Sequence, residues 1–199
     1  MKRTLLLMTL AAGSALLPRT ALSQIAPEKP HLRQVGPSYN YTVFAGWGYT
    51  SINQVNQSRS GLQGISASIT RDWGKYFGLT FDGGHYAWQT TASNAAVGKP
   101  SVDYYLGGPE LHAGLYGPTS VFVHALLGIA HTGGVNISPS ASPAGGIGMG
   151  MDYHIKPRVS LRLYGDDIFS DFTVVPYQQG DSPHIRWNAR AALGVAYHF

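Results

Sequence analysis

The sequence contains no cysteine, so neither a disulfide framework nor a lipid-anchored N-terminal cysteine contributes to its structure. Charged residues are scarce as well, at 12%, whereas soluble domains contain roughly a quarter. Beyond the N-terminal segment, no stretch reaches the ~18 consecutive apolar residues that a transmembrane helix needs. These shortages exclude a disulfide-stabilised domain and helical membrane spans, and the composition is unusual for a soluble domain.

The N-terminus has the pattern of an export signal. Two basic residues precede an apolar run over 5–17, and Ala21 and Ser23 are the small residues of a cleavage site. We predict a cleaved signal peptide over 1–23, a proline-rich periplasmic leader over 24–39, and a single folded domain over 40–199. The apolar run is too short to cross a bilayer as a helix.

The apparent basicity of the chain belongs mainly to this signal. Lys2, Arg3 and Arg19 lie within it, which leaves 11 of the 14 basic residues against 10 acidic ones. No basic surface remains that would indicate nucleic-acid binding. The glycines of GGIGMG (145–150) recur every second residue and no helix follows, so this motif is a strand and not a nucleotide loop. We expect no cofactor.

Aromatic and glycine-rich segments with a period of two fill the rest of the chain. In the closing segment, RWNARAALGVAYHF, apolar and small or polar residues alternate up to the last phenylalanine. Period two over about ten residues indicates a β-strand. Eight segments show this pattern, in or near 40–50, 64–70, 76–84, 104–115, 121–130, 146–155, 159–166 and 186–199.

The connections between these segments alternate between short and long. Tight turns are expected at 71–75, 116–120 and 156–158, and long polar connections at 51–60, 89–101, 131–146 and 170–185. This alternation is typical of an up-and-down barrel with one plain rim and one elaborated rim. It is not typical of a sandwich with Greek-key crossings. We predict an all-β, eight-stranded antiparallel up-and-down barrel.

The apolar face of each strand is predicted to point outward, into lipid. Ten-residue tilted strands match a bilayer, and the opposite face carries small and charged residues that suit a narrow interior. Aromatic residues near strand ends form the expected girdles of a transmembrane β-barrel: Trp47, Tyr49, Trp187, Tyr197 and Phe199. The fold-level alternative is a secreted, soluble lipocalin-like barrel with its apolar face inside.

The ending GVAYHF, with apolar residues on alternate positions, resembles the C-terminal signal of bacterial outer-membrane β-barrels. Segments such as YFGLTFDGG and SLRLYGDD resemble strands of small barrels related to the transmembrane domain of outer membrane protein A. The resemblance implies a Gram-negative outer-membrane location, contact with outer-membrane lipid, and recognition by the barrel-assembly machinery. It implies no peptidoglycan-binding role. The assembly signal would comprise Leu193, Val195, Tyr197 and Phe199.

Inward-facing charges define the candidate site. Folding each hairpin about its turn places Asp152 opposite Arg162, as a buried ion pair. The same reasoning places His112 opposite His124; two histidines without a carboxylate at matching depth make an incomplete metal site, so we interpret them as a polar pair. The predicted polar network of the lumen comprises Asp82, Glu110, His112, His124, Asp152, Arg162 and Arg190.

The most direct functional interpretation is a non-catalytic outer-membrane barrel with a structural or surface-interaction role. Its long loops, which carry Asp166, Asp167, Asp171 and Asp181, are candidates for contact with a surface ligand. A narrow, porin-like pore or small-molecule binder is one alternative. A lipid A-modifying enzyme is another: His85 and His131 have outward parity, but the chain contains no His-x-Ser pattern.

Overall fold

The computed structural model describes residues 39–53, 59–89, 99–115, 117–135, 139–170 and 186–199. The predicted signal peptide and nearly all of the predicted leader lie outside these residues. The described chain forms eight strands: β1 (Tyr41–Asn53), β2 (Arg59–Trp73), β3 (Phe77–Gln89), β4 (Lys99–Gly114), β5 (Thr119–Val135), β6 (Ser140–Lys156), β7 (Val159–Ser170) and β8 (Arg186–His198). In this part of the chain no helix is long and apolar enough to cross a bilayer.

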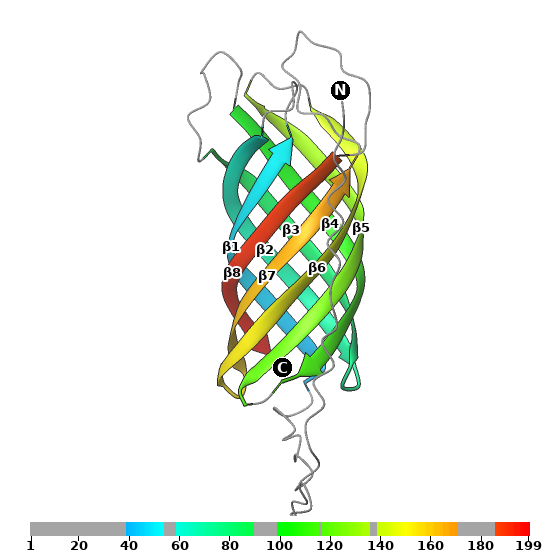
Figure 1. The fold of residues 1–199 in the computed structure, drawn as a ribbon, viewed down its shortest axis with the longest axis vertical. Helices are drawn as coiled ribbons and strands as arrows, with labels where there is room; N and C mark the ends of the chain where they lie inside the picture. Colours follow the sequence, from blue (N-terminus) through cyan, green and yellow to red (C-terminus); the bar gives the residue numbers. More distant parts are fainter. Residues whose placement is uncertain (1–38, 54–58, 90–98, 116, 136–138, 171–185) are drawn as a thin grey trace, which may run out of the picture. The chain divides into compact units, whose positions relative to one another are not determined.

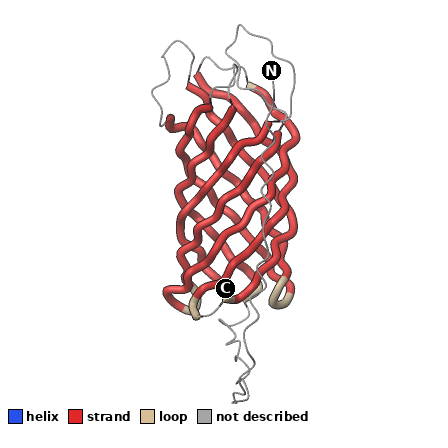
Figure 2. Tube along the Cα trace, in the orientation of Figure 1, coloured by secondary structure: helices blue, strands red, loops and turns tan. Residues whose placement is uncertain are grey.

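The strands close into one barrel in the order β1 to β8, and every neighbouring pair is antiparallel. Figure 1 shows the strands running obliquely around the barrel. Three short turns lie at one end, together with the C-terminus, and the longer connections lie at the other end (Figure 2). The predicted fold class is therefore confirmed. The predicted strict alternation of short and long connections is not, because β5 ends at Val135 and β6 begins at Ser140, which makes this connection as short as that between β4 and β5.

The strands are longer at the long-connection end than the alternation of the sequence indicates. We expected a loop over 131–146, yet β5 continues to Val135 and β6 begins at Ser140. Likewise β1 continues to Asn53, inside the expected 51–60 loop. Apolar and polar residues no longer alternate regularly in these regions, but the backbones remain paired, since Thr132 still pairs with Ser140. The alternation of apolar and polar residues shows which part of a strand has lipid on one side, whereas hydrogen bonding to the neighbouring strands determines where the strand ends.

The two faces of the strands are as predicted. Large apolar residues on one parity are exposed, among them Ile65 at 60% and Leu127 at 72%. Residues on the other parity are buried inside the barrel, including Asp82 and Arg190. The barrel is thus apolar outside and packed with both polar and apolar side chains inside, which is the reverse of a lipocalin-like arrangement.

Candidate functional site

The predicted partners Asp152 and Arg162 meet inside the barrel. They are direct cross-strand neighbours on β6 and β7. Arg162 donates two hydrogen bonds to the carboxylate, from Nε to Oδ1 and from the terminal nitrogen to Oδ2, each at 2.8 Å. The guanidinium also lies 4.5 Å from the centre of the Phe122 ring. A bidentate pair of this kind satisfies two buried charges at once.

Arg190 forms a second, larger ion cluster deeper in the barrel. Its Nε donates to Asp166 Oδ2 at 2.7 Å, and its guanidinium also contacts Asp82. Tyr164 donates its hydroxyl to the same Asp82 carboxylate at 3.1 Å. The cluster joins β8, β7 and β3, three strands that are not all neighbours in the barrel, so it ties opposite parts of the wall together.

The expected pairing of His112 with His124 is wrong by two positions. His124 lies opposite Glu110, and His112 lies opposite Phe122. The turn between β4 and β5 contains Gly117 with a φ of +81°, a left-handed conformation that favours glycine. The hairpin is therefore centred on Gly117 and not on the proline that follows it, which shifts the pairing by two residues.

This register places His124 between two carboxylates. Its Nε2 lies 2.7 Å from Asp166 Oδ1 and its Nδ1 lies 3.4 Å from Glu110 Oε2. Only the imidazolium form, with hydrogens on both ring nitrogens, can donate to both acceptors. His112 extends this series of polar contacts: its Nε2 lies 3.0 Å from Asp72 Oδ1 and 3.5 Å from Glu110 Oε1. The polar groups thus connect from Asp72, near the end of β2, to the Arg190 cluster.

One member of this network, Asp166, was not among the residues predicted to line the lumen. Asp166 was expected in a long loop, but it lies in β7 and is only 6% exposed. Asp167, its neighbour, lies in the same strand and faces outward, while Asp171 and Asp181 lie outside the described residues. The sequence did contain a signal for Asp166: it follows Arg162 and Tyr164 at intervals of two residues, so it lies on the same inward face of β7. Gly148 leaves room for the Asp166–His124 contact, since an added Cβ would overlap both side chains.

Apolar side chains fill much of the interior, which the prediction of a polar lumen did not anticipate. A rim cluster occupies the half nearer the long connections: Ile52, Leu62, Tyr86, Val102, Tyr104, Leu106, Leu126, Ala130, Ala144 and Ile168. A smaller turn-side cluster is interleaved with the charges: Phe44, Phe122, Tyr164, Ala192 and Ala196. The inward parity of Phe44, Phe122 and Leu126 was visible in the sequence.

The charged residues and the two clusters are closely packed. Arg190 lies 5.3 Å from the Tyr164 ring centre and 5.8 Å from that of Tyr104, so it contacts aromatic rings of both clusters. A cavity of about 10 Å³, which is about the space for one water, lies among polar groups that include Asp82, Glu110 and His124. This interior resembles a packed core and not a channel.

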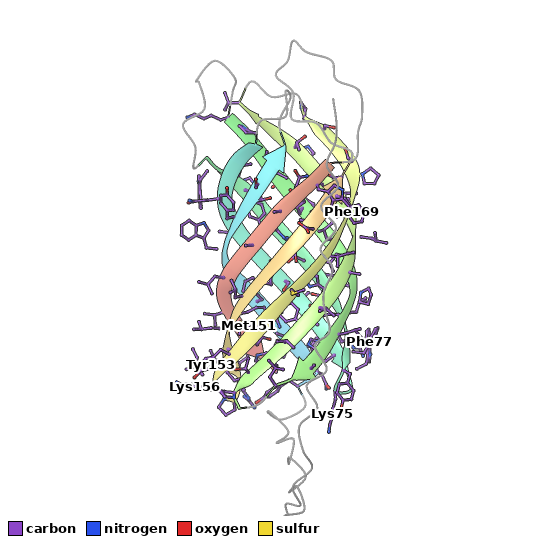
Figure 3. The ribbon with its side chains drawn as sticks, in the orientation of Figure 1. Lys75, Phe77, Met151, Tyr153, Lys156 and Phe169 are labelled. Atoms are coloured by element: carbon purple, nitrogen blue, oxygen red, sulfur yellow. The ribbon has the colours of Figure 1, made fainter. Side chains whose placement is uncertain are left out.

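Exposed aromatic side chains gather near both ends of the barrel wall. Figure 3 shows Phe77 and Tyr153 directed outward near the short turns, and Phe169 near the opposite end. Of the predicted girdle, Tyr197 and Phe199 lie at the short-turn end, and Trp187 packs 5.5 Å from Phe169. Trp47 is outward and 57% exposed, but it lies midway along β1 because that strand continues to Asn53.

The C-terminal residues close the barrel against β1. The Phe199 amide donates to the Tyr41 carbonyl at 2.9 Å, and the Tyr41 amide donates to the Phe199 carbonyl at 3.0 Å. Their rings stack with centres 5.6 Å apart. Nearby, hydrogen bonds with Tyr197 and Tyr39 raise the pKa of Arg158, which lies in the β6–β7 turn outside the strands. Of the predicted assembly-signal residues, Leu193, Val195 and Tyr197 also pair with β1 and point outward.

The outward histidines are brought together by a residue that the sequence analysis did not select. His85 pairs with Asp103 across β3 and β4, and Asp103 pairs with His131 across β4 and β5. In the part of the chain that the structure describes, no group of three or more His, Cys, Asp or Glu side chains is arranged to hold a metal ion.

No protein-family profile and no curated protein matches this sequence. Solved structures do match. Neisserial surface protein A is 14% identical, with a TM-score of 0.61, over 80% of this chain and 97% of its own. Ail, the attachment invasion locus protein of Yersinia pestis, is 11% identical, with a TM-score of 0.52, over 81% and 100%. The N-terminal β-barrel domain of Pseudomonas aeruginosa OprF is 17% identical, with a TM-score of 0.50, over 81% and 98%. The chain therefore has the fold of small, eight-stranded outer-membrane β-barrels.

Proposed function

We propose that this protein is a non-catalytic outer-membrane barrel of a Gram-negative bacterium, with a sealed lumen and a rim that interacts at the cell surface. The observation that carries the proposal is the packed interior. Asp152–Arg162 and the Arg190 cluster fill the charged part of the lumen, and the rim cluster fills the half next to the long connections. Eight strands enclose an interior that side chains can fill, so such a barrel supports surface contacts better than transport.

The unequal strand lengths support a role for the rim. β4, β5 and β6 contain 16, 17 and 17 residues, whereas β7 contains 12. A tilted strand needs only about 9–11 residues to cross a bilayer. At the short-turn end, the exposed aromatic side chains such as Phe77 and Tyr153 lie next to the turns, so the strands extend little beyond them there. The additional residues of β4, β5 and β6 therefore lie at the long-connection end. A wall of three strands would stand above the lipid and present a rigid surface to a partner.

Planar-bilayer conductance tests the sealed lumen. Purified wild-type barrel is expected to give no stepwise ion current, and Asp152→Ala or Arg162→Ala alone is expected to leave the trace flat, because the rim cluster remains in place. Steady current steps from the wild type would contradict the proposal and support the narrow-pore alternative.

Mass spectra of lipid A from cells with and without the protein test the enzymatic alternative. Altered acyl chains would contradict a non-catalytic role.

The lack of native cysteine permits a direct test of the rim. We introduce one cysteine at Ser140, at the start of β6, or at Lys75, in the β2–β3 turn. A membrane-impermeant maleimide should label Ser140→Cys on intact cells. Lys75→Cys, located at the opposite end (Figure 3), should react only after the outer membrane is permeabilised. The reverse pattern would place the rim in the periplasm and overturn its surface role.

A further inference from the structure

A polar row crosses the outer wall of β3, β4 and β5. His85 Nδ1 lies 2.5 Å from Asp103 Oδ1, and His131 Nδ1 lies 3.6 Å from the other oxygen of the same carboxylate. The imidazoles are 57% and 46% exposed and the carboxylate 22%. One carboxylate thus hydrogen-bonds to His85 and lies within ion-pair distance of His131, and both imidazoles are about half exposed on the outside of the barrel.

An apolar groove lies directly below this row on the same three strands. It has a volume of about 610 Å³, and its outward-facing lining is Leu79, Phe81, Gly83, Tyr105, Gly107 and Leu127. This size falls within the roughly 300–1,000 Å³ typical of small-molecule sites. Gly83 contributes open space to the hollow, because an added Cβ there would meet only one backbone oxygen, at 3.8 Å, whereas the Phe81 ring lies over Gly107, 3.0 Å from where a Cβ would stand.

The row and the groove form one continuous surface. His85 follows Gly83 by two residues and Asp103 precedes Tyr105 by two, so in β3 and β4 the next outward residue beyond the groove belongs to the row. In β5 the exposed side chain of Ile129 lies between Leu127 and His131 and pairs with Tyr105 at the edge of the groove. Because β3 runs from the short turns toward the long connections, the row lies at the end of the groove nearer the long-connection rim. An apolar hollow with polar groups at its outer end matches an acyl chain joined to a headgroup.

We propose that the outer wall of β3–β5 binds one phosphorylated lipid, with an acyl chain in the groove and its phosphate against His85 and His131. An anionic headgroup suits this end of the groove, since the imidazoles of His85 and His131 supply N–H donors and Lys99, further along the same outward face of β4, supplies a cation. Histidine and lysine nitrogens donate well to phosphate oxygens. This proposal rests on the membrane location proposed above, but not on the sealing of the lumen.

Native mass spectrometry of the detergent-solubilised mature barrel provides the test. Phosphatidylglycerol and diacylglycerol with the same acyl chains are titrated separately, so that only the phosphate headgroup differs. We expect wild type to retain one phosphatidylglycerol at least about tenfold more tightly than diacylglycerol, the size of a charge-assisted hydrogen bond. Equal retention of both lipids would overturn the assignment of the row to phosphate.

Variants separate the two halves of the site. His85→Gln/His131→Gln should abolish the preference for phosphatidylglycerol, whereas Asp103→Asn should preserve or strengthen it by removing a repulsive charge. Loss of binding in Asp103→Asn would overturn recognition of an anion and indicate a cationic ligand instead.

Filling the hollow tests the groove. Gly83→Leu should weaken retention of both lipids several-fold, because the new side chain would occupy the acyl-chain space. Gly165→Leu is the matched control: this glycine is also outward-facing, in β7, and an added Cβ meets only a backbone oxygen at 3.6 Å. Equal effects of the two leucines would overturn the groove assignment. Faster migration of each unboiled variant on a gel shows that the barrel itself is intact.

Discussion

Arg190 is fully buried and neutralises two carboxylates, Asp82 and Asp166, so its removal should cost more than that of any surface cation. We expect Arg190→Met to lower the free energy of unfolding by about 3–5 kcal/mol, because two buried charges lose their partner. Urea unfolding of the refolded barrel in lipid vesicles measures this change. The control is Arg71→Met, an exposed residue that stacks on Trp73, where about 0–1 kcal/mol is expected. A cost below 1 kcal/mol at Arg190 would show that the cluster contributes little to stability.

Residue pairing was predictable where the turn geometry was simple. The β6–β7 connection is short enough that Asp152 could be placed opposite Arg162 from the sequence. The β4–β5 turn was not, because the positive φ of Gly117 is a backbone property that spacing does not reveal. The partners of His124 therefore became visible only in the structure. Contacts across the lumen, such as Arg190 with Asp82, depend on barrel closure and have no local signal.

At the scale of the strand, the alternation of apolar and polar residues predicted which side chains point outward and which point into the barrel, but not where the strands end. In β7 the pattern continues through Asp166 and Ile168 inside and Asp167 and Phe169 outside, beyond the point where acidic residues indicated a loop. An outward aspartate breaks the apolar pattern without breaking the ladder, because β6 and β8 supply hydrogen-bond partners on both sides. Strand ends are thus a property of the neighbouring strands as much as of the strand itself.

The terminal strand permits a test of the proposed assembly signal. Phe199→Ala keeps the backbone hydrogen bonds with Tyr41 but removes the ring, so refolding in detergent should change little. In cells, the yield of heat-modifiable barrel should fall several-fold if the assembly machinery reads this side chain. Tyr153→Ala is the matched control, since Tyr153 lies at the same end of the barrel and both side chains are 52% exposed. Equal yields of the two variants would reject a special role for the C-terminal ring.

For the whole barrel, the interior consists of two barriers in series. The Asp152–Arg162 pair and the turn-side cluster occupy the half toward the short turns, the rim cluster occupies the other half, and Arg190 lies between the two clusters, against rings of both. A current must cross both, so opening one of them leaves the other closed. The two are joined where Arg190 contacts the Tyr104 ring, and the continuous packing of the lumen makes it a core that holds the wall in shape.

This arrangement predicts a non-additive response to hollowing. Arg162→Ala/Arg190→Ala opens the charged half, and Tyr86→Ala/Tyr104→Ala opens the rim half; each double variant alone should remain closed in a planar bilayer. The fourfold variant should give stepwise current. Since the remaining buried carboxylates, Asp82, Glu110, Asp152 and Asp166, outnumber the His124 imidazolium, that current should be carried by K⁺ in preference to Cl⁻. Current through either double variant would mean that one barrier alone seals the barrel. An anion-selective current would show that these carboxylates do not line the path.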